Sequence, residues 1–150
     1  MSQIKQILDA AQERGVRAGL PYSGAVSPGE AYELWQNVPG ACLVDVRSSA
    51  EWDLVGVVPD SVRIELRHYP GMVENPHFAA QLHKQVDPES LVLFMCRSGV
   101  RSDEAARLAV AAGFSHVYNV LEGFEGDRNA DGQRGMVAGW KGRGLPWRHP

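Results

Sequence analysis

The residues best suited to chemistry lie around Cys96. This cysteine directly follows the apolar run 91–95, which has the length of a strand, and a strongly helical stretch starts near Arg101. In parallel α/β sheets, ligand sites lie at the carboxyl ends of the strands. A loop that leads into a helix also points several backbone N–H groups at one spot, which favours an anion. Such donors are expected to hold Cys96 as a thiolate, the nucleophilic form of the side chain.

The neighbours of Cys96 support this interpretation. Arg97 and Arg101 add positive charge, and Gly99 lets the backbone curl tightly around the sulfur. The competing interpretation is structural, because a lone cysteine at the end of a strand is usually a small buried hydrophobe. However, the run Arg-Ser-Gly-Val-Arg-Ser has no reason to surround an inert core cysteine. We therefore expect a reactive thiol at Cys96.

The rest of the chain is expected to form an α/β fold that positions this loop. Helical and strand patterns alternate, which predicts a central parallel sheet with helices on both faces. Ser27 and Glu30 form a capping-box pattern at one helix start, with Pro28 at the first helical position. The expected strands are 22–26, 41–46, 62–64, 91–95 and 117–120. Three helices have both ends indicated: one from 28 to the stop at Pro39-Gly40, one over 75–86 and one over 101–112. A further helix is expected within 1–20, a short one is expected to start at 48, and another is expected near Gly139-Trp140.

Composition limits the classes of function. With 150 residues, 44% of them hydrophobic and 22% charged, the chain fits one soluble domain over 1–150. The formal net charge of −3 gives no attraction to nucleic acid or anionic membranes, so neither is expected as a partner. No signal peptide or membrane span is recognisable, and we expect a cytoplasmic protein. The 2 cysteines are too few for a disulfide scaffold, and Cys42, in an apolar run without basic neighbours, is expected in the core.

Three groups of residues together resemble the rhodanese family. The loop Cys96–Arg101 matches that family's active-site loop, C-R-x-G-x-R, which begins with a cysteine after a central strand. Asp45-Val46-Arg47 and Glu51-Trp52 match its upstream D-x-R and E-[WYF] signature. Its terminal G-x-x-x-W…G-L-P pattern is matched by Gly123, Gly139-Trp140 and Gly144-Leu145-Pro146. The resemblance spans 23–147 with the right order and spacing, and it implies a rhodanese-like fold.

The resemblance implies a sulfurtransferase, similar to thiosulfate:cyanide sulfurtransferase, that works in two steps. Cys96 would take the outer sulfur of a donor, either thiosulfate or another persulfide, and become a persulfide itself. An acceptor, which is cyanide, a thiol or a protein cysteine, would then remove that sulfur. Arg101 and Arg97 would bind the sulfonate end of the donor. Loop N–H groups would hold the persulfide, and they belong to Arg97, Ser98, Gly99, Val100 and Arg101.

Three further residues are expected to support the loop. The Ser102 hydroxyl would add a donor or, equally, cap the following helix. Asp45 and Arg47 follow a neighbouring strand and would brace the loop. The alternative, held equal, is a structural ion pair with Glu51.

No cofactor or metal is expected. None of the 5 histidines lies near a cysteine at metal-ligand spacing. Asp127, Asn129 and Asp131 match the first half of an EF-hand calcium loop, but Ala138 stands where the closing glutamate should be. Asx turns explain these residues without calcium.

Three segments lie outside the family pattern or depart from it. The family's G-H-I-P-G-A turn reads Gly56-Val57-Val58-Pro59-Asp60-Ser61 here and lacks the histidine. The terminal signature contains an insertion at 125–138, which we expect to be a surface loop on the active-site side. The helix within 1–20 is expected to be an N-terminal extension. Trp140 and Trp147 are candidates for a contact with another molecule.

Two other classes of protein share this fold. Cell-cycle dual-specificity phosphatases, and likewise arsenate reductases, are cysteine-dependent, and the phosphatase loop is one residue longer, C-x5-R. In this chain the position of that arginine is Ser102, and the arginine falls at Arg101. Non-catalytic rhodanese-like interaction modules lack the cysteine. Cys96 and both loop arginines are present here, which favours the sulfurtransferase.

Overall fold

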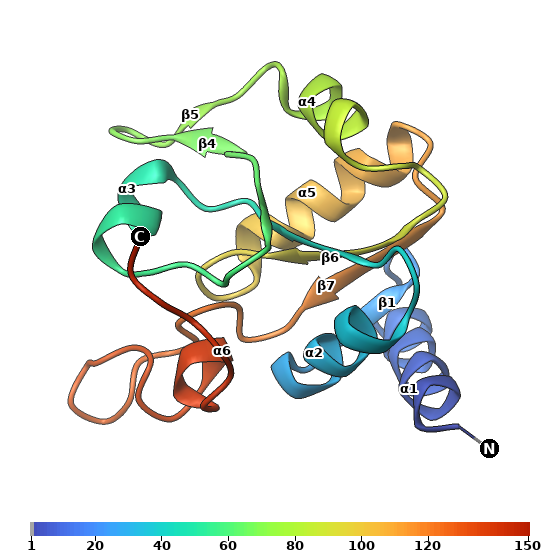
Figure 1. Cartoon of the computed structure of the whole chain (residues 1–150), viewed down its shortest axis with the longest axis horizontal. Helices are drawn as coiled ribbons and strands as arrows, with labels where there is room; N and C mark the ends of the chain where they lie inside the picture. Colours follow the sequence, from blue (N-terminus) through green and yellow to red (C-terminus); the bar gives the residue numbers. More distant parts are fainter. Residues whose placement is uncertain (1) are drawn as a thin grey trace.

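The computed structural model describes residues 2–150 and has a five-stranded parallel sheet at its centre (Figure 1). The strands lie in the order β1-β7-β6-β2-β3, so that β6 is central. They are β1 (Gly24–Val26), β2 (Cys42–Asp45), β3 (Val62–Arg63), β6 (Leu91–Met95) and β7 (His116–Val120). The expected α/β class and parallel sheet are confirmed.

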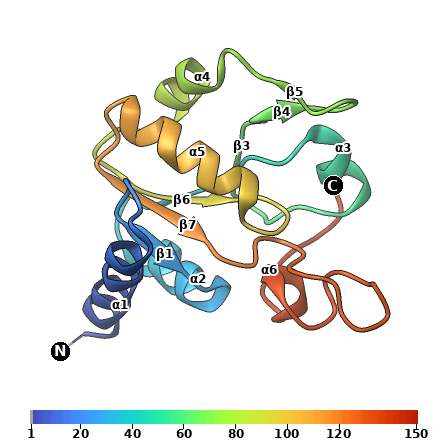
Figure 2. The ribbon, with the colours of Figure 1, turned by 180° about the vertical axis from the view of Figure 1, so that it is seen from behind.

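Helices cover both faces of the sheet (Figures 1 and 2). They are α1 (Gln3–Ala18), α2 (Pro28–Asn37), α3 (Ser49–Leu54), α4 (Phe78–Gln85), α5 (Val100–Ala111) and α6 (Gly139–Gly142). Side chains of α1, α2 and α6 share one apolar cluster with one face of the sheet, and those of α4 and α5 share a second cluster with the other face. The expected helices on both faces are therefore confirmed.

Local capping determines where two of the helices begin. The Glu30 N–H donates to Ser27 Oγ at 3.2 Å, and the Ser27 N–H donates to Glu30 Oε1 at 2.8 Å. This is the expected capping box of α2. Ser48 and Glu51 form the same box at the start of α3, directly after β2. The box therefore holds the Glu51 carboxylate near the carboxyl end of the sheet.

The central strand β6 is buried on both faces. Val92 and Phe94 belong to the apolar cluster under α4 and α5, whereas Leu93 and Met95 belong to the cluster under α1 and α2. All of these side chains are fully buried, as expected for a strand inside a parallel sheet. Because this packing fixes the register of β6, Cys96 leaves the sheet at a defined position.

The structure contains a second, small sheet that the sequence patterns do not predict. β4 (Arg67–His68) pairs with β5 (Val73–Glu74) in an antiparallel hairpin. Strands of 2 residues are too short to show an alternating pattern. The Pro70-Gly71 pair in the connecting turn is the sequence feature that indicates it. The hairpin lies beside α3, at the carboxyl end of β6 (Figure 1).

The helix within 1–20 packs directly on the sheet. Ile7 and Ala11 of α1 are buried against it. A Cβ atom at Gly24 of β1 would lie 2.2 Å from the Ala11 carbonyl oxygen, so only glycine allows the backbones to come this close. Among residues 2–150, no helix is long and apolar enough to cross a membrane.

Residues 125–138 form turns and bends without a helix or strand. Trp140, which follows them on α6, is fully buried, and its Nε1–H donates to the Pro146 carbonyl at 2.7 Å. The prediction that Trp140 is available for a contact with another molecule is therefore wrong. The indole fills the core beside Tyr32 and Trp35, with ring centroids 5.8 and 6.2 Å away.

Candidate functional site

The loop from Cys96 to Arg101 curls around the sulfur of Cys96. The cysteine is 1% exposed, and the Gly99 N–H donates to its Sγ at 3.1 Å. Gly99 has a φ of 112°, a backbone conformation that side chains disfavour. Gly99 is also the N-cap of α5, so the sulfur lies at the N-terminal end of a 12-residue helix. Free N–H groups at this end of a helix stabilise negative charge.

A serine and an asparagine complete the surroundings of the sulfur. Ser102 Oγ lies 3.3 Å from Cys96 Sγ and donates to Asn119 Oδ1 at 2.6 Å. The Asn119 amide donates in turn to the Gly99 carbonyl at 3.2 Å. Ser102 lies inside the first turn of α5 rather than at its cap, so the helix-capping alternative is wrong. Asn119, at the carboxyl end of β7, links both groups that contact the sulfur.

The two arginines of the loop differ in their partners. Arg101 Nη1 and Nη2 donate to the two carboxylate oxygens of Glu51 at 2.7 and 2.9 Å. Arg97 is exposed, and its guanidinium has no hydrogen bond or ion pair to residues 2–150. Glu51 therefore neutralises Arg101, which leaves Arg97 as the loop side chain with an unneutralised positive charge.

Asp45 and Arg47 form an ion pair beneath the loop, and both side chains are fully buried. Arg47 Nη2 donates to Asp45 Oδ2 at 2.7 Å and to the Gly56 carbonyl at 2.8 Å. The alternative of an ion pair with Glu51 is wrong, because Glu51 pairs with Arg101 across 50 residues of sequence. The Arg47 guanidinium lies 4.1 Å from the centroid of the Phe124 ring.

The segment after β7 holds the loop from its other side. The Phe124 N–H donates to the Cys96 carbonyl at 2.8 Å, and the Glu125 N–H donates to the Arg97 carbonyl at 3.0 Å. A Cβ atom at Gly123 would lie 2.5 Å from the Cys96 carbonyl oxygen, so this position requires glycine. Phe124 thus contacts both the loop and Arg47, which connects the buried ion pair to the cysteine.

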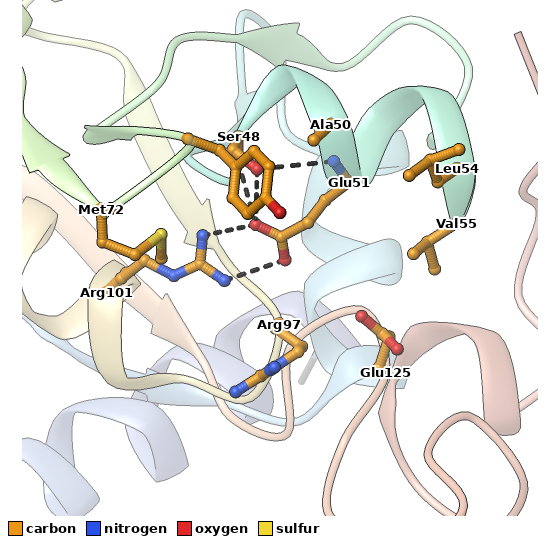
Figure 3. A pocket seen from close by; sticks show the side chains of 11 residues that line it. Ser48, Ala50, Glu51, Leu54, Val55, Met72, Arg97, Arg101 and Glu125 are labelled. Carbon is orange, nitrogen blue, oxygen red and sulfur yellow. Dashed lines mark hydrogen bonds and ion pairs between the residues drawn. The ribbon is translucent and has the colours of Figure 1, made fainter.

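A cleft of about 620 Å³ opens beside the loop (Figure 3). Both loop arginines line it, as do residues of α3 and of the hairpin turn between β4 and β5. Ser98 is half-buried and Val100 is 77% exposed, and neither lines this cleft. The lining residues are Ser48, Ala50, Glu51, Leu54, Val55, Tyr69, Gly71, Met72, Arg97, Arg101 and Glu125.

Comparison with known proteins identifies the family to which the chain belongs. The sequence profile described as the Rhodanese-like domain matches residues 27–130, more than half of the chain. The chain belongs to the rhodanese family. Among solved structures, this chain is similar to Rv0390 from M. tuberculosis, with a TM-score of 0.79 and 41% identity over 86% of this chain and 99% of that one.

Two curated relatives also resemble this chain. An uncharacterized protein of Rickettsia rickettsii is 31% identical over 128 residues, which cover 79% of this chain and 91% of the relative. Thiosulfate sulfurtransferase GlpE of Actinobacillus pleuropneumoniae is 30% identical over 121 residues, which cover 81% of this chain and 89% of GlpE.

The residues that match part of a calcium loop form a turn. Asn129 Oδ1 accepts hydrogen bonds from the N–H groups of Asp131 at 3.0 Å and Gln133 at 2.9 Å, which is the expected Asx turn. Over residues 2–150, no group of three or more His, Cys, Asp or Glu side chains is arranged to hold a metal ion.

The ion pair of Glu51 predicts a pH dependence of stability. Burial by itself would raise the pKa of Glu51, but the Arg101 guanidinium and the Ser48 donors overcome this and lower it to about 2. A carboxyl with a depressed pKa contributes stability above its unfolded-state pKa, which is 4.5, and loses it as the pH falls toward 2. We expect the free energy of unfolding to fall over this pH range, and to fall less in Glu51→Gln.

Chemical denaturation at stepped pH measures this effect. Glu74→Gln is the matched control, because Glu74 is exposed and its side chain has no ion pair to residues 2–150. Equal pH slopes for the Glu51→Gln variant and the wild type would contradict the assignment of this carboxylate to Arg101.

Proposed function

We propose that this rhodanese is a sulfurtransferase that carries sulfane sulfur as a persulfide on Cys96. The observation that carries the proposal is the buried Sγ at the centre of the loop, with the Gly99 N–H 3.1 Å away and Ser102 Oγ at 3.3 Å. These groups and the N-terminus of α5 favour an anionic sulfur. The similarity to thiosulfate sulfurtransferase GlpE supports thiosulfate as the donor.

The reaction has two nucleophilic steps. The Cys96 thiolate attacks the outer sulfur of thiosulfate, a new S–S bond forms, and the S–S bond of thiosulfate breaks, so that sulfite leaves with the electron pair. The acceptor, which is cyanide, a thiol or a protein cysteine, then attacks the outer sulfur of the persulfide. That sulfur leaves with the acceptor, and Cys96 returns to the thiolate.

The surrounding residues have distinct roles in this proposal. The Gly99 N–H donates to the sulfur anion, and Ser102 Oγ lies beside it with its proton donated to Asn119 Oδ1. Asn119 orients both groups. Arg97 binds the sulfonate end of the donor, because Glu51 already occupies the guanidinium of Arg101. Arg101 fixes the end of the loop, and the buried Asp45–Arg47 pair braces the loop through Phe124.

The division of roles between the arginines gives a prediction. We expect Arg97→Ala to raise the KM for thiosulfate about 10-fold to 100-fold, since a charge-assisted hydrogen bond contributes about 1.5–3 kcal/mol. Because Arg97 is exposed, its loss should leave the free energy of unfolding nearly unchanged. Steady-state kinetics with varied thiosulfate measure the effect, and Arg128→Ala, an exposed arginine in the 125–138 segment, is the matched control. An unchanged KM in Arg97→Ala would remove Arg97 from the site.

The assay that tests the proposed function compares two reactions. Purified protein is given thiosulfate with cyanide, and thiocyanate is measured; in parallel it is given an aryl phosphate, and phenol release is measured. We expect turnover only in the first reaction, because the loop is one residue shorter than the phosphatase loop and Ser102 takes the position of the phosphatase arginine. Robust hydrolysis of the aryl phosphate, without thiocyanate, would overturn the proposal in favour of a phosphatase.

A further inference from the structure

The walls of the cleft beside the loop are largely apolar. Leu54 is the last residue of α3 and Val55 follows it, and Tyr69 and Met72 lie between β4 and β5. Figure 3 shows Leu54, Val55 and Met72 around the cleft. Leu54 is 80% exposed, Tyr69 65% and Met72 40%. Large apolar side chains that are exposed together at a site of chemistry indicate a ligand that covers them.

The charged side chains of the cleft cancel one another. Glu51 and Arg101 form the bidentate ion pair described above, and Arg97 and Glu125 carry opposite charges. The formal charges of the lining therefore sum to zero, and Arg97 is the single side chain there that is left to bind the sulfonate of thiosulfate. Thiosulfate is also small, so that at Arg97 it would leave the apolar walls of Leu54 and Met72 uncovered.

We propose that the cleft receives an organic thiol with an apolar carbon arm, which acts as the sulfur acceptor; this inference rests on the proposed function. A volume of about 620 Å³ lies in the range of sites that enclose drug-sized organic molecules. The arm covers Leu54, Val55, Tyr69 and Met72, and the thiol points to the loop. The acceptor thiolate R–S⁻ attacks the outer sulfur of the Cys96 persulfide, an S–S bond forms in R–S–S⁻, and the bond to Cys96 breaks with its electron pair on Sγ.

The experiment starts from protein whose Cys96 has been loaded with sulfur from thiosulfate. Its sulfur is then transferred to four acceptors at equal concentration of the nucleophilic anion, which is cyanide or the thiolate, and second-order rate constants are measured by loss of the persulfide mass. The acceptors are cyanide, 2-mercaptoethanesulfonate, 2-phenylethanethiol and a short peptide with one cysteine between leucines. The two apolar thiols are 2-phenylethanethiol and the peptide, and the anionic thiol is 2-mercaptoethanesulfonate. We expect the rate constant of the faster apolar thiol to be about tenfold higher than that of the anionic thiol, because burial of part of an apolar arm is enough for this difference.

Two double variants test whether the preference for apolar thiols depends on the side chains of the cleft. In the double variant Leu54→Ser with Met72→Ser, the ratio of the apolar-thiol rate to the cyanide rate should fall about tenfold. In the control, Val16→Ser with Leu108→Ser, it should not change, because these exposed residues lie on α1 and α5 outside the cleft.

The outcomes separate this inference from the proposed function. A preference for 2-phenylethanethiol assigns the cleft to a free thiol, and a preference for the peptide assigns it to a protein cysteine; both support the inference. Equal rates for all the thiols, a faster anionic thiol, or the same ratio in both double variants would overturn it while leaving the sulfurtransferase intact. Failure of thiosulfate to load Cys96 would instead count against the proposed function.

Discussion

Replacing Cys96 with serine is expected to abolish sulfur transfer from thiosulfate to cyanide, with a loss of about a thousandfold or more. A serine hydroxyl is not ionised at neutral pH and needs a base to become a nucleophile. Among residues 2–150, the hydrogen-bond contacts of Cys96 Sγ are the Gly99 N–H and Ser102 Oγ, and neither is a base. Thiocyanate release under saturating thiosulfate measures the loss. Substantial activity in Cys96→Ser would show that sulfur is transferred without a persulfide on Cys96.

The second cysteine supplies a matched control for this experiment. Cys42 is half-buried at the start of β2, and burial raises the pKa of its thiol, so that little of it is the reactive thiolate. We expect Cys42→Ser to retain at least about half of the wild-type rate. If both single variants lost activity equally, the assignment of the chemistry to Cys96 alone would be wrong.

Breaking the buried Asp45–Arg47 pair is expected to have the largest effect on stability. Both side chains are 0% exposed, so Asp45→Asn leaves the Arg47 cation buried without its counter-charge. Loss of one partner in such a pair costs about 3–5 kcal/mol, a large part of the total stability of about 5–15 kcal/mol of an ordinary domain. Because Arg47 also packs on Phe124, the variant should lose sulfur transfer at temperatures where the wild type remains folded.

Urea denaturation followed by fluorescence measures this loss, and two controls interpret it. Lys5→Ala removes an exposed ion pair with Asp9 and should change the free energy of unfolding by no more than about 1 kcal/mol. The double variant Asp45→Leu with Arg47→Met removes both charges and should recover much of the loss. If Asp45→Asn had the same free energy of unfolding as Lys5→Ala, the Asp45–Arg47 pair would not stabilise the fold as we expect.

The parts of the fold that the sequence predicts depend on capping residues and on short apolar runs. The capping box of Ser27 with Glu30 begins α2, and the run 91–95, apolar at every position, is the buried central strand. The placement of Cys96 follows from these elements, because it directly follows the last residue of β6 and begins the loop to α5. Each of these features depends on residues within a few positions of one another.

Partners that lie far apart in sequence could not be predicted in the same way. Arg101 meets Glu51 only because β2 and β6 are neighbours in the sheet, which brings the start of α3 to the loop. Asn119 reaches Ser102 and Gly99 because β7 lies on the other side of β6. Its sequence indication is that Asn119 is a strongly polar residue inside the expected strand 117–120. Strand order is set by tertiary packing, and no local pattern records it.

The measurement that tests the central claim most directly is the intact mass of the protein after a single exposure to thiosulfate. Reduced protein is mixed with thiosulfate, freed of excess reagent and weighed by mass spectrometry, with Cys96→Ser alongside. We expect a gain of one sulfur atom in the wild type, its loss on adding cyanide, and no gain in the variant. An equal gain in Cys96→Ser, or no gain in the wild type with thiosulfate or with a low-molecular-weight persulfide, would contradict a persulfide carried by Cys96.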